Sequence, residues 1–211
     1  MAKTRPGRIK YYNIFSYVYD LFINLHSGKD KGTTRSFLID CAVSIKEEHP
    51  RILDLCCGTG SVLIGFMERI QSEIAVGCDF SRGMLQRASI KSGKSCNWVE
   101  SDVTQLPFDD SSFEIITCSH ALYELKGQHR KTALMEMRRV VKPDGVVLIM
   151  EHEVPIRPLI RFFFNMRMAA MGSEDAAEFV KAGEKPFRAI FSEVQTAHTP
   201  SGKSKVFKCK K

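Results

Sequence analysis

Acidic side chains close three successive apolar segments of this chain, and their type and spacing are well suited to ligand chemistry. They are Asp54, Asp79 and Asp102. Each segment is short and mainly apolar, which predicts a buried β-strand, and the carboxyl ends of parallel strands meet at one edge of a sheet. A turn readily explains one such acid, but not three in succession. We therefore expect a ligand site at this edge, with carboxylates that accept hydrogen bonds from the ligand.

The first acid opens a glycine-containing turn, Asp54-Leu-Cys-Cys-Gly58-Thr59-Gly60, and a helical segment follows at once. Glycine in such a turn lets the backbone approach a ligand closely. A dinucleotide site would require a third glycine where Leu63 stands, so the Gly-x-Gly-x-x-Gly pattern of nicotinamide oxidoreductases is incomplete. The Asp54 carboxylate would also repel a pyrophosphate, and it favours a cationic ligand. A plain strand–turn–helix corner is the alternative for this motif taken alone.

The second and third acids fit a bound nucleoside. Asp79 lies 19 residues after Gly60, the distance at which the next strand presents an acid to ribose hydroxyls. Its alternative role is to cap the following helix, but Ser81 is better placed for that. Asp102 is suited to accept a hydrogen bond from an adenine amino group, and a turn acid is an equal alternative at that position alone.

Strand-like and helix-like segments alternate along the chain, which predicts an α/β fold with a doubly wound, mostly parallel sheet. The last two apolar segments predict an antiparallel hairpin, so we expect seven strands. The turn at 142–145 is expected to stop a helix and reverse the chain. The expected strands are 51–57, 73–80, 95–102, 113–119, 145–151, 191–198 and 203–208. The expected helices are 11–25, 33–46, 61–70, 81–90, 130–141 and 158–171.

Length and composition fit a single domain, with 211 residues of which 44% are hydrophobic and 26% charged. We expect a helical lid over residues 1–50, a cofactor-binding core over 51–152, and covering helices with the terminal hairpin over 153–211. No apolar run is long enough to span a bilayer and the N-terminus is not a secretory signal, so we expect a soluble, cytoplasmic protein. Seven cysteines without a Cys-x-x-Cys pair favour free thiols over disulfides, and no metal site is expected.

The formal net charge of +7 comes largely from the two ends of the chain. Solvated basic termini are the simplest interpretation, and attraction to an anionic substrate or membrane surface is the alternative. Nucleic-acid binding would distribute basic residues through the body of the chain with interleaved aromatics, so no nucleic-acid partner is expected. The apolar segment 159–171 is interpreted as a contact to a hydrophobic substrate, a peripheral membrane surface or a partner. The sequence does not decide among these, nor does it indicate an oligomeric state.

In combination, the motifs resemble those of the class I S-adenosylmethionine-dependent methyltransferases, over about residues 50–152. The glycine turn resembles the first motif of that family, with Cys56 where glycine is more usual. The resemblance implies a Rossmann-like fold, S-adenosyl-L-methionine as cofactor, and in-line methyl transfer to a small-molecule acceptor. The cofactor-binding residues that it implies are Tyr19, Asp54, Cys56, Gly58, Thr59, Gly60, Asp79, Phe80, Ser81, Met84, Asp102, Val103 and Ser119.

A narrower resemblance is to the ubiquinone/menaquinone-biosynthesis C-methyltransferases. It rests on the pairs Tyr12-Asn13 and Tyr19-Asp20 and on the segment 151–159. In that branch an N-terminal Tyr-Asp helix covers the cofactor, and a proline-containing segment follows the fifth strand. The resemblance therefore implies a hydrophobic acceptor that is quinone-, phenol- or lipid-like.

A carbon or oxygen acceptor must lose a proton, so a base is needed within hydrogen-bond reach. His120 follows the fourth expected strand, whereas Glu151 and His152 end the fifth, and all three are expected to face the pocket. His120 is the first choice as base or substrate ligand, with a role as a helix-end residue as its alternative. Glu151 and His152 are comparable candidates for catalysis.

Two other classes of function stay open at this point. One is a non-catalytic methyltransferase-like subunit that binds a partner, against which the three intact acids count. The other is a methyltransferase of nucleic acid or protein. The Asn/Asp-Pro-Pro-Tyr-type segment of amino-group DNA methyltransferases is absent, because residues 119–122 are Ser-His-Ala-Leu. A small-molecule acceptor is therefore preferred.

Overall fold

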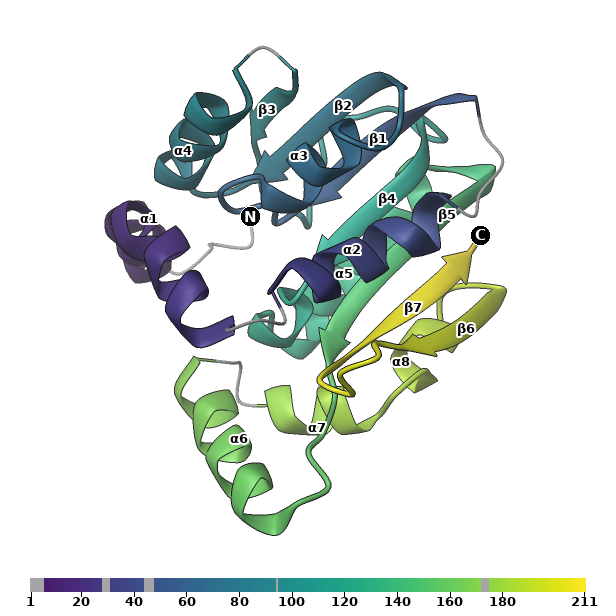
Figure 1. The fold of residues 1–211 in the computed structure, drawn as a ribbon. Coiled ribbons are helices and arrows are strands. Elements are labelled where there is room, and N and C mark those ends of the chain that lie inside the picture. Colours follow the sequence, from purple (N-terminus) through teal and green to yellow (C-terminus); the bar gives the residue numbers. More distant parts are fainter. Residues whose placement is uncertain (1–5, 28–30, 44–47, 94, 172–174) are drawn as a thin grey trace.

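The computed structural model describes residues 6–27, 31–43, 48–93, 95–171 and 175–211, which include a seven-stranded sheet (Figure 1). The strand order is β3-β2-β1-β4-β5-β7-β6. The first five strands are parallel, and β7 runs antiparallel to both β5 and β6. The predicted mostly parallel sheet with a C-terminal antiparallel hairpin is confirmed. The strands are β1 (His49–Leu55), β2 (Ser72–Asp79), β3 (Asn97–Glu100), β4 (Phe113–Ser119), β5 (Val141–His152), β6 (Glu193–His198) and β7 (Ser204–Lys210).

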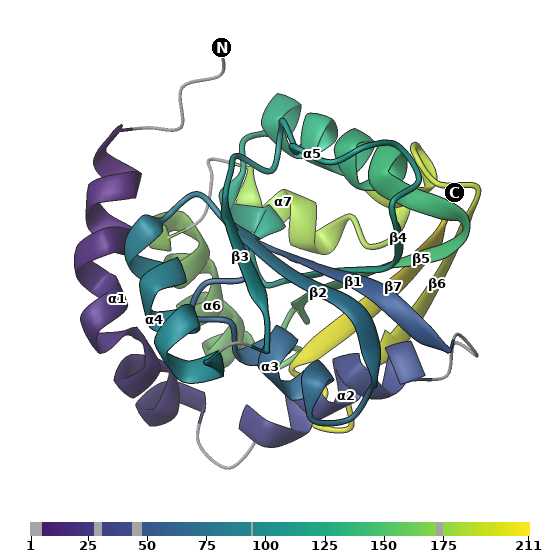
Figure 2. The same cartoon turned by 90° about the horizontal axis from the view of Figure 1, so that it is seen from above.

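Helices cover both faces of this sheet, as the alternation of segments predicts (Figure 2). Helices α2 and α3 pack on one face, and α5 and α7 cover the other, which makes the sheet doubly wound. The sequence did not indicate the short helices α7 and α8. The helices are α1 (Pro6–Ser27), α2 (Lys31–Val43), α3 (Ser61–Met67), α4 (Arg82–Ser92), α5 (Gly127–Val140), α6 (Pro158–Met171), α7 (Ala176–Lys181) and α8 (Lys185–Arg188), with a 3-10 turn η2 (Leu122–Glu124).

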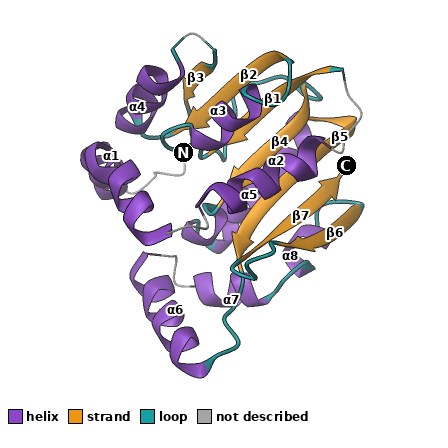
Figure 3. Cartoon of the chain, in the orientation of Figure 1, coloured by secondary structure: helices purple, strands orange, loops and turns teal. Residues whose placement is uncertain are grey.

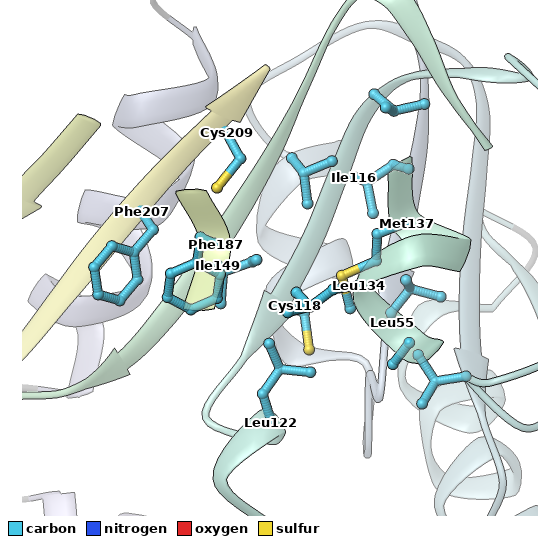
Figure 4. Close-up of a cluster of buried hydrophobic side chains, with 14 of the residues drawn as sticks. Leu55, Ile116, Cys118, Leu122, Leu134, Met137, Ile149, Phe187, Phe207 and Cys209 are labelled. Atoms are coloured by element: carbon cyan, nitrogen blue, oxygen red, sulfur yellow. The ribbon is translucent and has the colours of Figure 1, made fainter. Parts of the chain in front are cut away.

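The central strands are mainly apolar in their inner parts, where both of their faces are buried. On the α5 side, Leu55, Ile116 and Ile149 of three neighbouring strands belong to the same core cluster as Leu134 and Met137 of α5 (Figure 4). The edge strand β6 instead alternates between buried and exposed positions near its start. This burial fixes the register of the sheet, since a slip by one residue would turn the apolar side chains of an edge strand outward.

The segment 142–145 differs from the expected turn. Helix α5 ends at Val140 and β5 begins directly at Val141, without a connecting loop. Phe113 pairs with Val141 but Ile115 pairs with Val146, so the extra residues form a bulge within the strand pair. Pro143 ends the helical pattern as expected. Proline has no backbone N–H to donate to the neighbouring strand, and the bulge tolerates this missing hydrogen bond.

Two helices lie beyond the carboxyl ends of the parallel strands, where the predicted site residues are (Figure 1, Figure 3). Helix α1 packs against α4, and α6 follows β5 after a short extended segment. Of the two N-terminal helices, α1 thus lies over the strand ends and α2 packs on one face of the sheet. Among the described residues, no helix combines the length and apolar character needed to cross a bilayer.

Gly77 of β2 offers a test of this packing. A Cβ atom there would lie 2.2 Å from the Trp98 ring and 3.1 Å from the Cys57 sulfur. We expect Gly77→Ala to lower the free energy of unfolding by about 1–3 kcal/mol through overpacking. Urea unfolding measures this, with Gly127→Ala in α5 as control, because its nearest neighbour would be 3.6 Å away. Equal stability of the two variants would contradict the close packing of Trp98 on β2.

Candidate active site

The chain leaves β1 through a turn in which several residues have left-handed backbone conformations. The φ angles are 53° at Cys56, 54° at Gly58 and 74° at Gly60. A Cβ atom on Gly60 would lie 2.3 Å from the Trp98 ring, whereas nothing lies within 4 Å of a Cβ built on Gly58. Gly60 is thus required by packing, and Gly58 leaves the backbone open to an approaching ligand. The conformation of Cys56 explains why glycine is more usual at that position.

Asp79, at the end of β2, joins this turn to the start of α4. Its Oδ2 accepts a hydrogen bond from the Gly58 N–H (2.9 Å), and its Oδ1 accepts one from the Ser81 N–H (2.8 Å). Each carboxylate oxygen has two lone pairs, so capacity remains for ligand hydroxyls. Burial raises the pKa of Asp79 to about 6, against the opposing effect of these backbone hydrogen bonds. As predicted, Ser81 rather than Asp79 caps α4, since its Oγ accepts from the Met84 N–H.

Asp54 lies one residue before the end of β1, and its side chain is only 1% exposed. Its Oδ1 accepts a hydrogen bond from Thr117 Oγ1 at 2.7 Å, whereas its Oδ2 has no hydrogen-bond partner among the described residues. Burial raises the pKa of Asp54 to about 7. A buried acceptor atom without a partner is costly, so a cationic or N–H-bearing ligand at this point would satisfy it.

The other predicted adenosine contacts lie at the same end of the sheet, after β2 and β3. Met84 and Val103 are buried, and the Phe80 ring packs edge-on against Tyr12. Asp102 follows β3, and its Oδ1 accepts hydrogen bonds from the N–H and the hydroxyl of Thr104. Asp102 thus stabilises a local turn, which was the alternative to a ligand-binding role for this residue. Its contact to adenine stays a prediction.

Helix α1 is held over these residues by polar contacts to two different elements. Asn13 Oδ1 accepts from Ser81 Oγ and from the Gly83 N–H, at the start of α4. Thr59 Oγ1 donates to Asp20 at 2.7 Å, and Lys91 forms an ion pair with the same carboxylate. These contacts bring the second half of the predicted Tyr-Asp helix onto the glycine turn.

A third contact ties the first half of α1 to the segment after β4. The Tyr12 hydroxyl donates to Glu124 at 2.6 Å, and Arg8 pairs with the same carboxylate. Tyr19 lies farther along α1, and burial raises its pKa. Asp79 and Glu124 are among the acids close enough to raise it further. These interactions place Tyr19 near Asp79 at the end of β2 and near Glu124 after β4, and its contact to a ligand stays a prediction.

Arg35 of α2 is a site residue that the sequence reasoning did not single out. Burial lowers its pKa, and Tyr19, Asp20 and Asp54 oppose that effect. Arg35 also lies near enough to His120 to lower the pKa of that imidazole. The sequence feature that could have indicated Arg35 is a basic residue within a helix that was already expected to cover the site.

The predicted catalytic residues come together at the ends of β4 and β5. The rings of His120 and His152 have centroids 4.4 Å apart. His120 Nδ1 lies 3.1 Å from Ser119 Oγ, and its Nε2 lies 3.0 Å from Ser204 Oγ. The guanidinium of Arg167, from α6, donates to His152 Nε2 at 2.6 Å. Tyr123 and Phe164 complete an aromatic wall around His152.

Burial sets the protonation states of this group of residues. Desolvation lowers the pKa of His120 to about 4 and that of His152 well below its ordinary value, so both imidazoles are neutral at pH 7. The Glu151 carboxyl is fully buried, and desolvation raises its pKa to about 8. Neither of its oxygens has a hydrogen-bond partner among the described residues, although Arg130 and nearby backbone N–H groups partly offset the shift. His120, His152 and Glu151 thus form a neutral, apolar surface at the ends of β4 and β5, which we call the floor of the site.

These features fit a ligand that carries a cation, hydroxyl groups and an aromatic base. The unsatisfied Asp54 oxygen, the open backbone at Gly58 and the Asp79 carboxylate lie at neighbouring strand ends. All seven cysteines have free thiols. In the described part of the chain, no group of three or more histidine, cysteine or carboxylate side chains is arranged to hold a metal ion.

Comparison with known proteins agrees with this arrangement. A family profile described as a methyltransferase domain matches residues 52–145. A demethylmenaquinone methyltransferase of Staphylococcus aureus (strain MRSA252) is 36% identical over 173 residues, which cover 79% of this chain and 70% of that protein. The ubiquinone/menaquinone biosynthesis C-methyltransferase UbiE of Desulfotalea psychrophila is 28% identical over 178 residues, 82% of this chain and 71% of that protein.

A solved structure, described as the DhpI–SAH complex, has a TM-score of 0.69 at 14% identity and covers 96% of this chain and 94% of its own. That likeness shows the shared fold. The chain belongs to the class I S-adenosylmethionine-dependent methyltransferases. Within that class it falls in the branch of the quinone-biosynthesis enzymes, and S-adenosyl-L-methionine is its methyl donor. The predicted family, enzyme class and cofactor are therefore confirmed, and the nicotinamide alternative is discarded.

Asp79 gives a direct test of the ribose contact. We expect Asp79→Ala to raise the Kd for S-adenosylmethionine at least about tenfold, because hydrogen bonds to a buried carboxylate are lost. Calorimetric titration measures this, with NADH as a ligand that should not bind. Asp109→Ala, on an exposed loop, serves as the matched control. Circular dichroism checks that the fold is intact, and an unchanged affinity would remove the ribose role from Asp79.

Glu151 predicts a dependence of stability on pH. Its pKa is about 8 in the folded chain and near 4.5 when exposed, so the folded state holds the proton more tightly. Its contribution to stability is therefore complete below about pH 4.5 and is lost as the pH rises towards 8. Glu151→Gln cannot ionise and therefore avoids this loss. The free energy of unfolding of the variant, relative to that of the parent, should rise by at least about 1 kcal/mol between pH 5 and pH 8.

Urea unfolding at the two pH values measures that difference. Glu136→Gln is the control, because the hydrogen-bonded Arg139 lowers the pKa of Glu136. Its titration therefore lies below this window, and its stability difference from the parent should be nearly the same at pH 5 and pH 8. A pH-independent difference between parent and Glu151→Gln would mean that Glu151 is already ionised in the folded protein.

Proposed function

We propose that this enzyme methylates a ring carbon of a reduced quinone, or of a closely related phenolic acceptor, that carries an apolar side chain. The observation that carries the proposal is the buried floor at the ends of β4 and β5. Its aromatic and imidazole rings, His120, His152, Tyr123 and Phe164, suit a flat ring with hydroxyl groups. The relatives named demethylmenaquinone methyltransferase and UbiE support the same acceptor class.

S-adenosylmethionine, when bound, supplies a methyl group on a sulfonium, which needs no further activation by the protein. We assign the ribose hydroxyls to Asp79 and the positively charged amino group of the methionine portion to Asp54, whose free oxygen would then be satisfied. Arg35 faces the same acids and is suited to pair with the cofactor's carboxylate. The remaining contribution of the chain is alignment and the exclusion of water, which α1 provides by closing over the turn.

Methylation at a ring carbon requires the acceptor hydroxyl to lose its proton as that carbon attacks the methyl group. The proton on the attacked carbon then leaves and the oxygen regains a proton, which restores the aromatic hydroxyl ring, so that one proton is released overall for each methyl group transferred.

His120 and His152 are both neutral. His152 Nε2 accepts from Arg167, so its Nδ1 carries the proton and would orient the ring by donating a hydrogen bond to an acceptor oxygen. His120 contacts Ser119 and Ser204 through its two nitrogens, so it would contribute by packing against the ring. The lowered pKa makes both histidines weak bases. Glu151, with a pKa of about 8, is better matched to take up the proton near neutral pH.

This assignment gives each predicted region a role. Residues 1–50 act as the lid, 51–152 hold the cofactor, and 153–211 cover the acceptor, with Arg167 of α6 and Ser204 of β7 touching the histidine pair. Cofactor contacts at Phe80, Ser81, Met84, Val103 and Ser119 belong to the same proposal. No nucleic-acid partner is part of it, and the cytoplasmic compartment stays a prediction.

The test is methyl transfer from S-adenosylmethionine to a panel of acceptors, with products identified by mass spectrometry. Reduced demethylated naphthoquinols and benzoquinols with short apolar tails should be methylated on carbon. The oxidised quinones, which lack the hydroxyl proton donor, should not react. Catechols and free fatty acids test the phenol- and lipid-like alternatives. Cofactor binding without methylation of any acceptor would favour a non-catalytic subunit or a macromolecular substrate instead.

The role of the floor is tested with Glu151→Gln, His120→Gln and His152→Gln. Each should lower kcat by about 10²–10⁴-fold while the Kd for S-adenosylmethionine stays unchanged. The parent enzyme's kcat should rise with pH to a plateau above about pH 8, where Glu151 is ionised. That rise should be absent in Glu151→Gln. A Glu151→Gln variant with the parent's kcat and pH profile would exclude Glu151 as the base.

A further inference from the structure

Exposed apolar side chains are concentrated at one end of the molecule. Of the fourteen large apolar side chains that are exposed on the described part of the chain, eleven lie in two short stretches. Five are on α1 and six are in or just before α6, and both helices lie beyond the carboxyl ends of the parallel strands (Figure 1). The two stretches contain Tyr11, Ile14, Tyr17, Val18 and Leu21, and then Ile156, Leu159, Ile160, Phe162, Phe163 and Met166. Exposed apolar side chains concentrated in this way mark an interaction site.

Helix α6 is apolar on its inner and its outer face. Met168 and Phe164 face the protein, where Met168 is buried and Phe164 packs near His152. Leu159, Phe162, Phe163 and Met166 follow the i, i+3, i+4, i+7 spacing of one helical face, and they are 55–68% exposed. A helix that is apolar on both sides is stable where both sides are covered, so the outer face requires a partner.

The charge around α6 indicates what that partner is. The segment 155–171 contains Arg157, Arg161 and Arg167 but no aspartate or glutamate. Arg157 and Arg161 are exposed at the start of the helix, and Arg167 reaches inward to His152. Aromatic and aliphatic side chains flanked by arginines, without acids, match the boundary between acyl chains and anionic headgroups.

We propose that the outer face of α6, with its flanking arginines, docks this enzyme on the surface of an anionic lipid bilayer. At 14 residues, α6 is about 21 Å long, which is too short to cross a bilayer and suits a helix lying in its surface plane. Its inner face forms part of the aromatic wall around His152. Docking thus places the proposed acceptor pocket at the membrane surface, where an apolar acceptor would be dissolved. The proposal concerns lipid binding and does not depend on the identity of the acceptor.

The test is flotation of the full-length protein with lipid vesicles. The protein should float with vesicles of phosphatidylcholine mixed with phosphatidylglycerol, float less with phosphatidylcholine alone, and dissociate as salt is raised. Phe162→Ser/Phe163→Ser should weaken partition into the anionic vesicles at least about tenfold. Arg157→Gln/Arg161→Gln should reduce the preference for anionic lipid while leaving binding to neutral vesicles unchanged.

Met135→Ser is the matched control, because Met135 is a comparably exposed side chain on α5 (54%), outside both stretches. It should float as the parent does. The Kd for S-adenosylmethionine and the midpoint of thermal unfolding show whether each variant is folded. The arginine variant tests the proposal even if the phenylalanine variant does not fold.

Three results would overturn the proposal. The first is a parent protein that floats with neither vesicle, and the second is a folded Phe162→Ser/Phe163→Ser variant that floats as well as the parent. The third is a concentration-dependent dimer, seen by analytical ultracentrifugation and abolished by the same variant, without vesicle binding. That last result would mean that a second copy of the chain covers α6.

Discussion

The carboxylate of Asp79 is the contact on which the rest of the site depends. It binds the backbone of the glycine turn at Gly58 and the first turn of α4 at Ser81, so two loops from neighbouring strands share one anchor. Ser81 in turn donates to Asn13, which fixes α1 over the same place. A ligand that binds Asp79 therefore contacts a residue already coupled to the turn below and the helix above. Binding there and ordering of α1 are linked through a single side chain.

Low polarity at the strand ends determines which proton-transfer chemistry is available. Burial raises the pKa of Asp54 and of Glu151 and lowers that of His120, and each shift favours the uncharged form. The floor under the acceptor is consequently close to neutral overall. An apolar ring can enter such a floor without displacing strongly hydrated ions, whereas a charged or strongly hydrophilic acceptor would lose more hydration than the floor can replace.

Much of the fold follows from local pattern, since continuous apolar runs and glycine turns specify buried strands and their ends. Seven strands, their directions and the acids at their ends were all predictable from the sequence. The bulge at 142–145 was not, because Pro143 indicates only that a helix stops and not that a strand begins. Ser204 lies 84 residues from His120 in sequence, so only the tertiary fold brings them together. The protonation of Glu151 and the role of Arg35 depend on burial, which residue type does not specify.

The attachment of α1 to the rest of the molecule has a consequence for turnover. Its contacts to Ser81, Thr59 and Glu124 are polar and partly exposed, whereas several large apolar side chains of α1 face solvent. Each such contact is individually weak, so α1 can detach locally at far less free-energy cost than unfolding of the sheet. If α1 acts as the proposed lid, the spent cofactor leaves through this local opening while the core stays assembled. The residence time of the product on the enzyme is consequently set by a few hydrogen bonds along one helix, which makes that time adjustable by substitutions that leave the chemistry untouched.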